Sequence, residues 1–255
     1  MEAIILIVVF GLAWGSFLNV VIFRLPQGLS LLKPRSFCPE CRTMIPFYDN
    51  IPLFSYIILR GKCRKCGARI SPVYLLVEVL TPVCFLLIYL RYGPGLHFWA
   101  SGLFTTGLII LGFVDFRHKI LPDIITLPGF ALSLAYAFFR PDLKPVQSLI
   151  GAAVGGGFLL IVYGAYYALR KKEGLGLGDV TLMLMIGAFL GWRLTLLTLI
   201  LASVVGALAG ILLIIRKKKD LQFALPFGSF LAPAAFIALL WGETMVTAYL
   251  GLYGR

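Results

Sequence analysis

Four cysteines stand in two pairs within residues 24–72, the longest polar stretch of the chain. The pairs are Cys38-Pro-Glu-Cys41 and Cys63-Arg-Lys-Cys66, a C-x2-C spacing that recurs after 21 residues. Each pair brings two thiolates to one ion, and two pairs complete the tetrahedral sulfur set of a zinc site. Four thiolates leave no position for water, so the predicted zinc is structural rather than catalytic. Two disulfides or four free thiols are the alternatives.

Two aspartates occupy a second chemical setting, at the ends of apolar runs. Asp115 ends the run 108–114, and Asp179 opens the run 180–186. Two neighbouring carboxylates cannot both ionise cheaply, so one of them keeps a proton. The ionised group can then take a proton from water while the protonated group polarises a peptide carbonyl. The positions therefore favour Asp115 and Asp179 as an aspartic-peptidase pair, and helix N-caps are the plainer alternative.

Other residues near this pair support or compete with it. Gly174, Gly176 and Gly178 alternate before Asp179, and such a bare backbone admits close approach of an extended substrate. Asp123 follows Pro122 and is interpreted as a helix-start group that supports the site. Glu78 lies a few residues inside an apolar run, where it can pair with a cation, hold a substrate amine or assist group transfer.

The composition shows what must position these groups. Hydrophobic residues make up 60% of the 255 residues and charged residues only 13%, about half the share in soluble domains. This excludes disorder, collagen and a disulfide-rich secreted scaffold. Continuous apolar runs of about 20 residues predict membrane-spanning helices. The predicted fold is all-α, with about eight transmembrane helices near 3–23, 73–90, 97–114, 122–139, 147–169, 178–191, 194–215 and 226–250.

The basic residues predict how the chain is oriented. The connecting loops on one side carry 18 Lys and Arg residues, and the other side carries 5. The basic side is therefore expected in the cytoplasm, together with the ends of the helices that hold both aspartates. A reducing cytoplasm favours zinc over disulfides. The net charge of +12 is explained by topology and anionic lipid, and no nucleic-acid-binding motif accompanies it.

These predictions divide the chain into three regions: a first transmembrane helix over 1–23, a cytoplasmic zinc-binding loop domain over 24–72, and a helical bundle with the peptidase site over 73–255.

The chain also resembles the type IV prepilin peptidases over most of its length. The resemblance rests on the following segments: Gly15 to Pro26, Cys38 to Cys41, Asp49-Asn50-Ile51-Pro52, Leu59 to Gly67, Ser71-Pro72-x-Tyr74, Val77-Glu78, Asp115-x6-Pro122-Asp123 and Gly176-x-Gly178-Asp179.

The resemblance implies a bifunctional enzyme of the bacterial inner membrane, with its active site at the cytoplasmic face. Its peptidase pair falls on Asp115 and Asp179. The implied substrates are the prepilins and pseudopilins of type IV pili and type II secretion, cut after a Gly that follows a basic leader. The new N-terminal residue is then methylated from S-adenosylmethionine, whose binding residues the sequence does not identify. Two departures stand out: Thr181 where Lys is frequent, and Ser229 where Pro is common.

Three alternatives remain open. A peptidase without methyltransferase activity would fit the same motifs, although the zinc loop favours the bifunctional type. A transporter would use intramembrane acids as ion sites, but such acids usually lie near the midplane of repeated halves. A non-catalytic assembly scaffold would tolerate substitution of Asp115 and Asp179.

Overall fold

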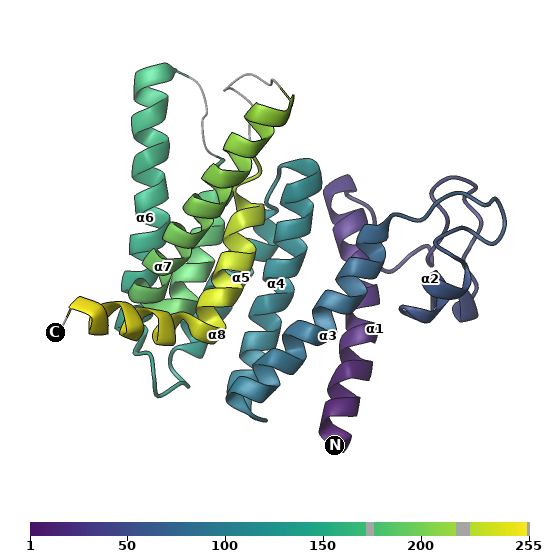
Figure 1. Ribbon diagram of the computed structural model, residues 1–255, viewed down its shortest axis with the longest axis horizontal. Coiled ribbons are helices and arrows are strands. Elements are labelled where there is room, and N and C mark those ends of the chain that lie inside the picture. The colour runs from purple at the N-terminus through teal and green to yellow at the C-terminus, as the bar shows by residue number, and fades with distance from the viewer. Residues whose placement is uncertain (172–175, 218–224, 254–255) are drawn as a thin grey trace. The chain divides into compact units, whose positions relative to one another are not determined.

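The computed structural model describes residues 1–171, 176–217 and 225–253. The described residues are mainly helical and form no regular strand, which confirms the all-α prediction (Figure 1). The helices are, in chain order, α1 (Glu2–Arg24), η1 (Leu25–Gln27), η2 (Phe47–Asn50), α2 (Phe54–Ile58), α3 (Pro72–Tyr92), α4 (Leu96–His118), α5 (Asp123–Tyr136), α6 (Pro145–Arg170), α7 (Leu177–Lys217) and α8 (Gly228–Tyr253).

Six of the described helices are long and apolar enough to cross a membrane, and they are α1, α3, α4, α6, α7 and α8. This confirms a multi-pass helical membrane protein. The predicted count of eight is approximate, because α5 has only 14 residues and α7 contains an internal break. A helix of 14 residues is about 21 Å long, so α5 is shorter than an ordinary span.

The chain divides into two compact units, Met1–Gly102 and Leu103–Arg255. In the first unit α1 packs closely on α3. A Cβ atom at Gly11 would lie 2.6 Å from Cα of Pro82, and one at Gly15 would lie 3.0 Å from Cα of Glu78. Small residues let two membrane helices approach this closely. The amide of Asn19 adds a hydrogen bond to the carbonyl of Tyr74 at 2.9 Å.

The polar loop of the first unit is tied to the end of α1 by a buried arginine. The guanidinium of Arg24 donates to the carbonyls of Ser30 (2.8 Å) and Pro34 (2.7 Å), and it also lies over the ring of Phe37. Backbone carbonyls thus satisfy a charge that is only 4% exposed. The start of the loop is fixed where the span ends.

In the second unit α7 turns back on itself at Gly191. Gly191 has φ 75° and ψ 166°, which breaks the helix. The carbonyl oxygen of Met183 and Cγ2 of Thr195 both lie 2.8 Å from the Cβ position of Gly155 on α6. Twelve residues of straight helix would separate those two groups by about 18 Å. Both parts of α7 therefore pack on the same stretch of α6, and α7 supplies two of the predicted spans.

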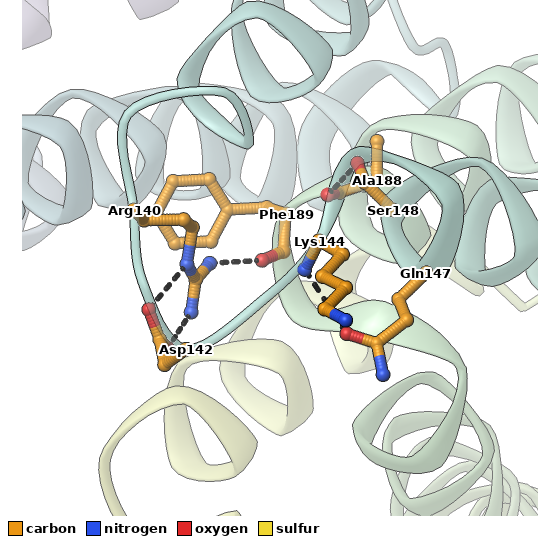
Figure 2. A network of polar contacts seen from close by, with 7 residues as sticks. All are labelled: Arg140, Asp142, Lys144, Gln147, Ser148, Ala188 and Phe189. Carbon is orange, nitrogen blue, oxygen red and sulfur yellow. Dashed lines mark hydrogen bonds and ion pairs between the residues drawn. The ribbon is translucent and has the colours of Figure 1, made fainter.

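The break at Gly191 leaves helix carbonyls without their usual amide partners, and side chains replace them (Figure 2). The hydroxyl of Ser148 donates to the carbonyl of Ala188 at 2.5 Å, and Arg140 donates to the carbonyl of Phe189 at 2.7 Å. Asp142 forms an ion pair with Arg140. These contacts fix the short first part of α7, which carries Asp179 at its other end.

Candidate active site and metal centre

Asp115 lies in the last turn of α4, only 5% exposed, and its carboxylate caps the start of α8. Its Oδ2 accepts the backbone N–H of Ser229 at 2.8 Å and lies 3.1 Å from the Ser229 hydroxyl. The backbone amide of Gly228 also bonds to this carboxylate. The first N–H groups of a helix have no partner within the helix and carry partial positive charge. The N-terminus of α8 therefore supplies hydrogen-bond donors to the Asp115 carboxylate.

Asp179 lies in the first turn of α7, 7% exposed, and approaches the same point from another helix. Its side chain bonds to the backbone amide of Gly176 and to that of Gly228. Its own N–H donates to the carbonyl of Gly176 at 3.1 Å. Gly176 and Asp179 therefore cap the N-terminus of α7 by reciprocal hydrogen bonds. Oδ1 of Asp179 is buried and has no hydrogen-bond partner among the described residues.

The two carboxylates thus meet at one backbone amide, that of Gly228. A Cβ atom at Gly228 would lie 3.0 Å from Oδ2 of Asp115 and 3.0 Å from Cδ1 of Leu121. No larger residue fits without displacing one of those groups. The structure therefore brings together the two aspartates selected from sequence, which lie far apart along the chain.

Asp123 lies beside this pair and bonds to α7 rather than to the other carboxylates. Its Oδ1 accepts the hydroxyl of Thr181 at 3.1 Å and that of Thr126 at 3.3 Å. Thr181 is two residues beyond Asp179, so this contact joins the start of α5 to the start of α7. The role of Asp123 as a supporting group stays a prediction.

One of the glycines before Asp179 serves packing within the chain. A Cβ atom at Gly178 would lie 2.7 Å from Cβ of Leu121, so Gly178 lets α7 approach the segment before α5. Gly174, predicted as part of a substrate-binding stretch, lies outside the described residues. Close approach of the chain to itself thus accounts for Gly178, whereas a Cβ atom at Gly176 would make only ordinary contacts, at 3.5 Å from Oδ2 of Asp179.

The four loop cysteines form one cluster. Their sulfur atoms all lie within 4.8 Å of one another, close enough to bind a single ion. The two halves share one hydrogen-bond pattern: the N–H of Arg42 donates to the carbonyl of Cys38 (2.8 Å), and the N–H of Gly67 donates to that of Cys63 (2.9 Å). Arg42 and Gly67 both have positive φ, 56° and 72°. Gly67 therefore has the left-handed turn expected of it, and Arg42 adopts the same turn despite its side chain.

The electrostatics of the cluster favour a cation. Hydrogen bonds from the side chain and the backbone of Thr43 lower the pKa of the Cys41 thiol to about 6. At Cys66 the Ala68 amide lowers the pKa, but desolvation and the other three thiols outweigh it and raise the value to about 12. The pKa of the Cys63 thiol is also lowered, so the cluster favours thiolates at Cys41 and Cys63 and disfavours one at Cys66. A divalent cation would stabilise all four thiolates together, so the four residues fit zinc.

Two other acids of the first unit have structural contacts. Asp49 accepts both Nε (2.7 Å) and Nη2 (2.6 Å) of Arg64, and this ion pair lowers the pKa of the Asp49 carboxyl. Oε2 of Glu78 accepts the N–H of Leu53 at 2.8 Å, which joins the start of α2 to α3. Both residues link the metal loop to itself or to its supporting helices.

Sequence reasoning missed the partners of Asp115. Ser229 was noted only as a departure from a pattern, and Gly228 was not singled out. A signal was present, since Pro226-Phe-Gly228-Ser229 precedes an apolar run, and small polar residues there mark a helix start. What the sequence does not show is which carboxylate that helix start faces.

Fold and site together define a multi-pass helical membrane protein with two buried carboxylates at helix N-termini and a four-cysteine loop. Residues 9–92 match the Bacterial Peptidase A24 N-terminal domain, and residues 102–211 match the Type IV leader peptidase family. The chain belongs to the type IV leader peptidase family.

Similar curated proteins support this assignment over almost the whole chain. A protein of Aeromonas hydrophila is 38% identical, with 96% of this chain and 93% of that protein covered. One of Pseudomonas putida is 36% identical (98% and 95% covered), and one of Pseudomonas aeruginosa is 36% identical (97% and 93% covered). Each is named prepilin leader peptidase/N-methyltransferase. No solved structure matches the chain.

Proposed function

We propose that the chain is a membrane-embedded aspartic endopeptidase that removes the basic leader of prepilins and pseudopilins and then N-methylates the new N-terminal residue. The observation that carries the proposal is the meeting of Asp115 and Asp179 at the amide of Gly228. Its support is membership of the type IV leader peptidase family and the shared name of the similar proteins.

The chemistry follows from two carboxylates in different protonation states. An ionised carboxylate accepts a proton from water, and the water oxygen attacks the carbonyl carbon after the leader's Gly. The protonated carboxyl donates to the carbonyl oxygen, where negative charge develops. Both aspartates are almost fully buried, so little bulk water weakens these interactions. Asp115 and Asp179 are the proposed catalytic residues.

The metal-binding residues have a different task. Cys38, Cys41, Cys63 and Cys66 would hold one zinc ion, and four sulfur ligands leave it no open position for a substrate. The ion, when bound, supplies folding free energy to a loop with few buried apolar residues. It takes no part in peptide hydrolysis.

The proposed setting is the bacterial inner membrane, with the active site at the cytoplasmic face. The excess of Lys and Arg in the loops on that side supports this orientation. The proposed regions are a first span over 1–23, a cytoplasmic metal loop over 24–72 and a peptidase bundle over 73–255. A prepilin helix in the bilayer would present its leader junction at the depth of the aspartates.

The test is incubation of the purified enzyme with a prepilin and isotopically labelled S-adenosylmethionine, followed by mass analysis of the product. We expect loss of the leader and one labelled methyl group on the new first residue. Asp115→Asn and Asp179→Asn should each reduce cleavage by about 10²–10⁴-fold. The matched control is Glu243→Gln, which makes the same change in an exposed ion pair with Arg193.

The outcomes separate the alternatives. Leader removal without a methyl group would indicate a peptidase alone. Near-normal cleavage by either aspartate variant would exclude that residue from the catalytic pair. A wild-type enzyme that binds prepilin without cutting it would favour the scaffold.

A further inference from the structure

Ser229 places two possible donors on a single carboxylate oxygen of the proposed active site. We propose that Ser229 is a positioning residue that holds Asp115 as the ionised, water-activating member of the pair, which leaves Asp179 as the member that holds the proton. This inference rests on the proposed function and adds to it the division of labour between the two aspartates.

The donors on Asp115 favour its charged form. Backbone N–H groups of Gly228 and Ser229 can only donate, and the Ser229 N–H is 2.8 Å from Oδ2. An acceptor of two amides at a helix N-terminus is stabilised as the anion, by hydrogen bonding and by the helix dipole. A protonated carboxyl at this position would lose much of that stabilisation.

The Ser229 hydroxyl has a more adaptable role than the amide. Its oxygen lies 3.1 Å from Oδ2 of Asp115 and 3.0 Å from the carbonyl oxygen of Pro226. A hydroxyl has one proton, so it donates to the carboxylate or to the carbonyl. When Asp115 has taken up a proton, the hydroxyl can accept from Asp115 and donate to Pro226. The amide therefore selects the ionised state, while the hydroxyl serves both states.

Asp179 also accepts backbone amides, those of Gly176 and Gly228, but it differs from Asp115 in having one oxygen without a donor. Its Oδ1 is buried without a partner among the described residues, and burial without hydrogen bonds disfavours a charged oxygen. Among the described residues, the charged groups that act on Asp115 are Asp179, from α7, and Lys119, which follows α4. Asp123, at the start of α5, bonds to threonines. A proton shared by the pair is thus more stable on Asp179.

The assignment gives a balanced reaction. Asp115 takes a proton from water, the water oxygen bonds to the carbonyl carbon, and Asp179 gives its proton to the carbonyl oxygen. The C–N bond then breaks, Asp115 returns its proton to the leaving amine, and Asp179 recovers a proton from a hydroxyl of the intermediate. Both carboxyls end in their starting states, and the net change is hydrolysis.

The experiment compares pH–rate profiles of kcat/KM for prepilin cleavage by the full-length enzyme and two variants. Ser229→Ala removes the hydroxyl and keeps the amide, whereas Ser229→Pro removes both donors and is tolerated in the first turn of a helix. Loss of donors to the ionised Asp115 should move the acidic limb to higher pH, by about one pH unit in Ser229→Pro and by less in Ser229→Ala.

The control is Ser133→Ala, because the hydroxyl of Ser133 is buried but bonds to the carbonyl of Gly129. Its profile should match the wild type, and the thermal transition of all variants establishes folding. An acidic limb unmoved in both Ser229 variants, or movement of the basic limb alone, would overturn the assignment. The Asn variants of Asp115 and Asp179 separate the two claims: if those variants are inactive, only the division of labour has failed.

Discussion

The metal cluster and the carboxylate pair are two polar sites in one apolar chain, and they are assembled in opposite ways. The cysteines lie within residues 38–66, and two local turns with the same hydrogen bonds position them. The carboxylate pair needs α4, α7 and the start of α8, which are far apart in sequence. The first site depends on local turn geometry and on the zinc ion proposed for it. The second depends on the packing of a helical bundle.

This difference predicts that the two sites respond independently to substitution. Removal of the ion should unfold a loop and leave the helix starts of the second unit in place. Loss of a packing contact in the second unit should leave the zinc content unchanged. Three substitutions test this, in order of decreasing effect.

The largest effect is expected from Cys63→Ser, which removes one of four zinc ligands. Structural zinc contributes on the order of 10 kcal/mol to the folding of small metal domains. We expect zinc to fall from one ion per chain to none and protease sensitivity to increase in the loop. Metal analysis and limited proteolysis measure both.

Cys84→Ala is the matched control, because Cys84 is buried in α3 outside the cluster. It should retain one zinc per chain. Wild-type protein purified without zinc, yet with a protease-resistant loop, would contradict the metal assignment.

An intermediate effect is expected from Arg140→Gln in the second unit. This change removes the ion pair with Asp142 and weakens the contact to the carbonyl of Phe189 beside the break in α7 (Figure 2). A lost hydrogen bond from a charged group costs about 1.5–3 kcal/mol. The thermal transition should therefore fall, while zinc content stays at the wild-type value. Loss of zinc in this variant would show that the two sites are not independent.

The smallest effect is expected from Asp123→Asn. The amide oxygen of Asn can still accept the hydroxyl of Thr181, so the contact between the starts of α5 and α7 weakens without disappearing. Cleavage should fall less than about tenfold, which corresponds to about 1.4 kcal/mol. Asp123→Ala, which retains no acceptor, should lose more. Complete loss of cleavage in a folded Asp123→Asn enzyme would move Asp123 into the catalytic set.

The two sites also differ in how far the sequence could predict them. The C-x2-C spacing implies a cluster because the ligands of each pair are a turn apart, and the positive φ at Gly67 followed from its residue type. The aspartates could be chosen only by their common depth at the ends of apolar runs. The amides of Gly228 and Ser229 were not predicted, because backbone donors carry no residue-type signal and their acceptor lies on a distant helix.

The helices were predicted well where length and hydropathy decide them, including the division of α7 near Gly191, and less well at α5. Residues 122–139 are apolar enough for a span, yet the helix ends at Tyr136. At Gly191 the chain reverses, and the side chains of Ser148 and Arg140 stabilise the break by donating hydrogen bonds to the carbonyls of Ala188 and Phe189. Such tertiary compensation is invisible in a hydropathy pattern.

The short length of α5 has a consequence for the surrounding lipid. At about 21 Å it falls short of the roughly 30 Å of hydrocarbon in a bilayer, and the first part of α7 over 177–190 is equally short. Lipid adapts to short elements by thinning around them. Both α5 and the first part of α7 begin beside the aspartates. We therefore expect lipid headgroups and water to lie closer to the proposed cleavage site there than elsewhere in the bilayer. Water would then reach the scissile peptide bond of a membrane-anchored substrate. In a bilayer of normal thickness that bond would be shielded from water.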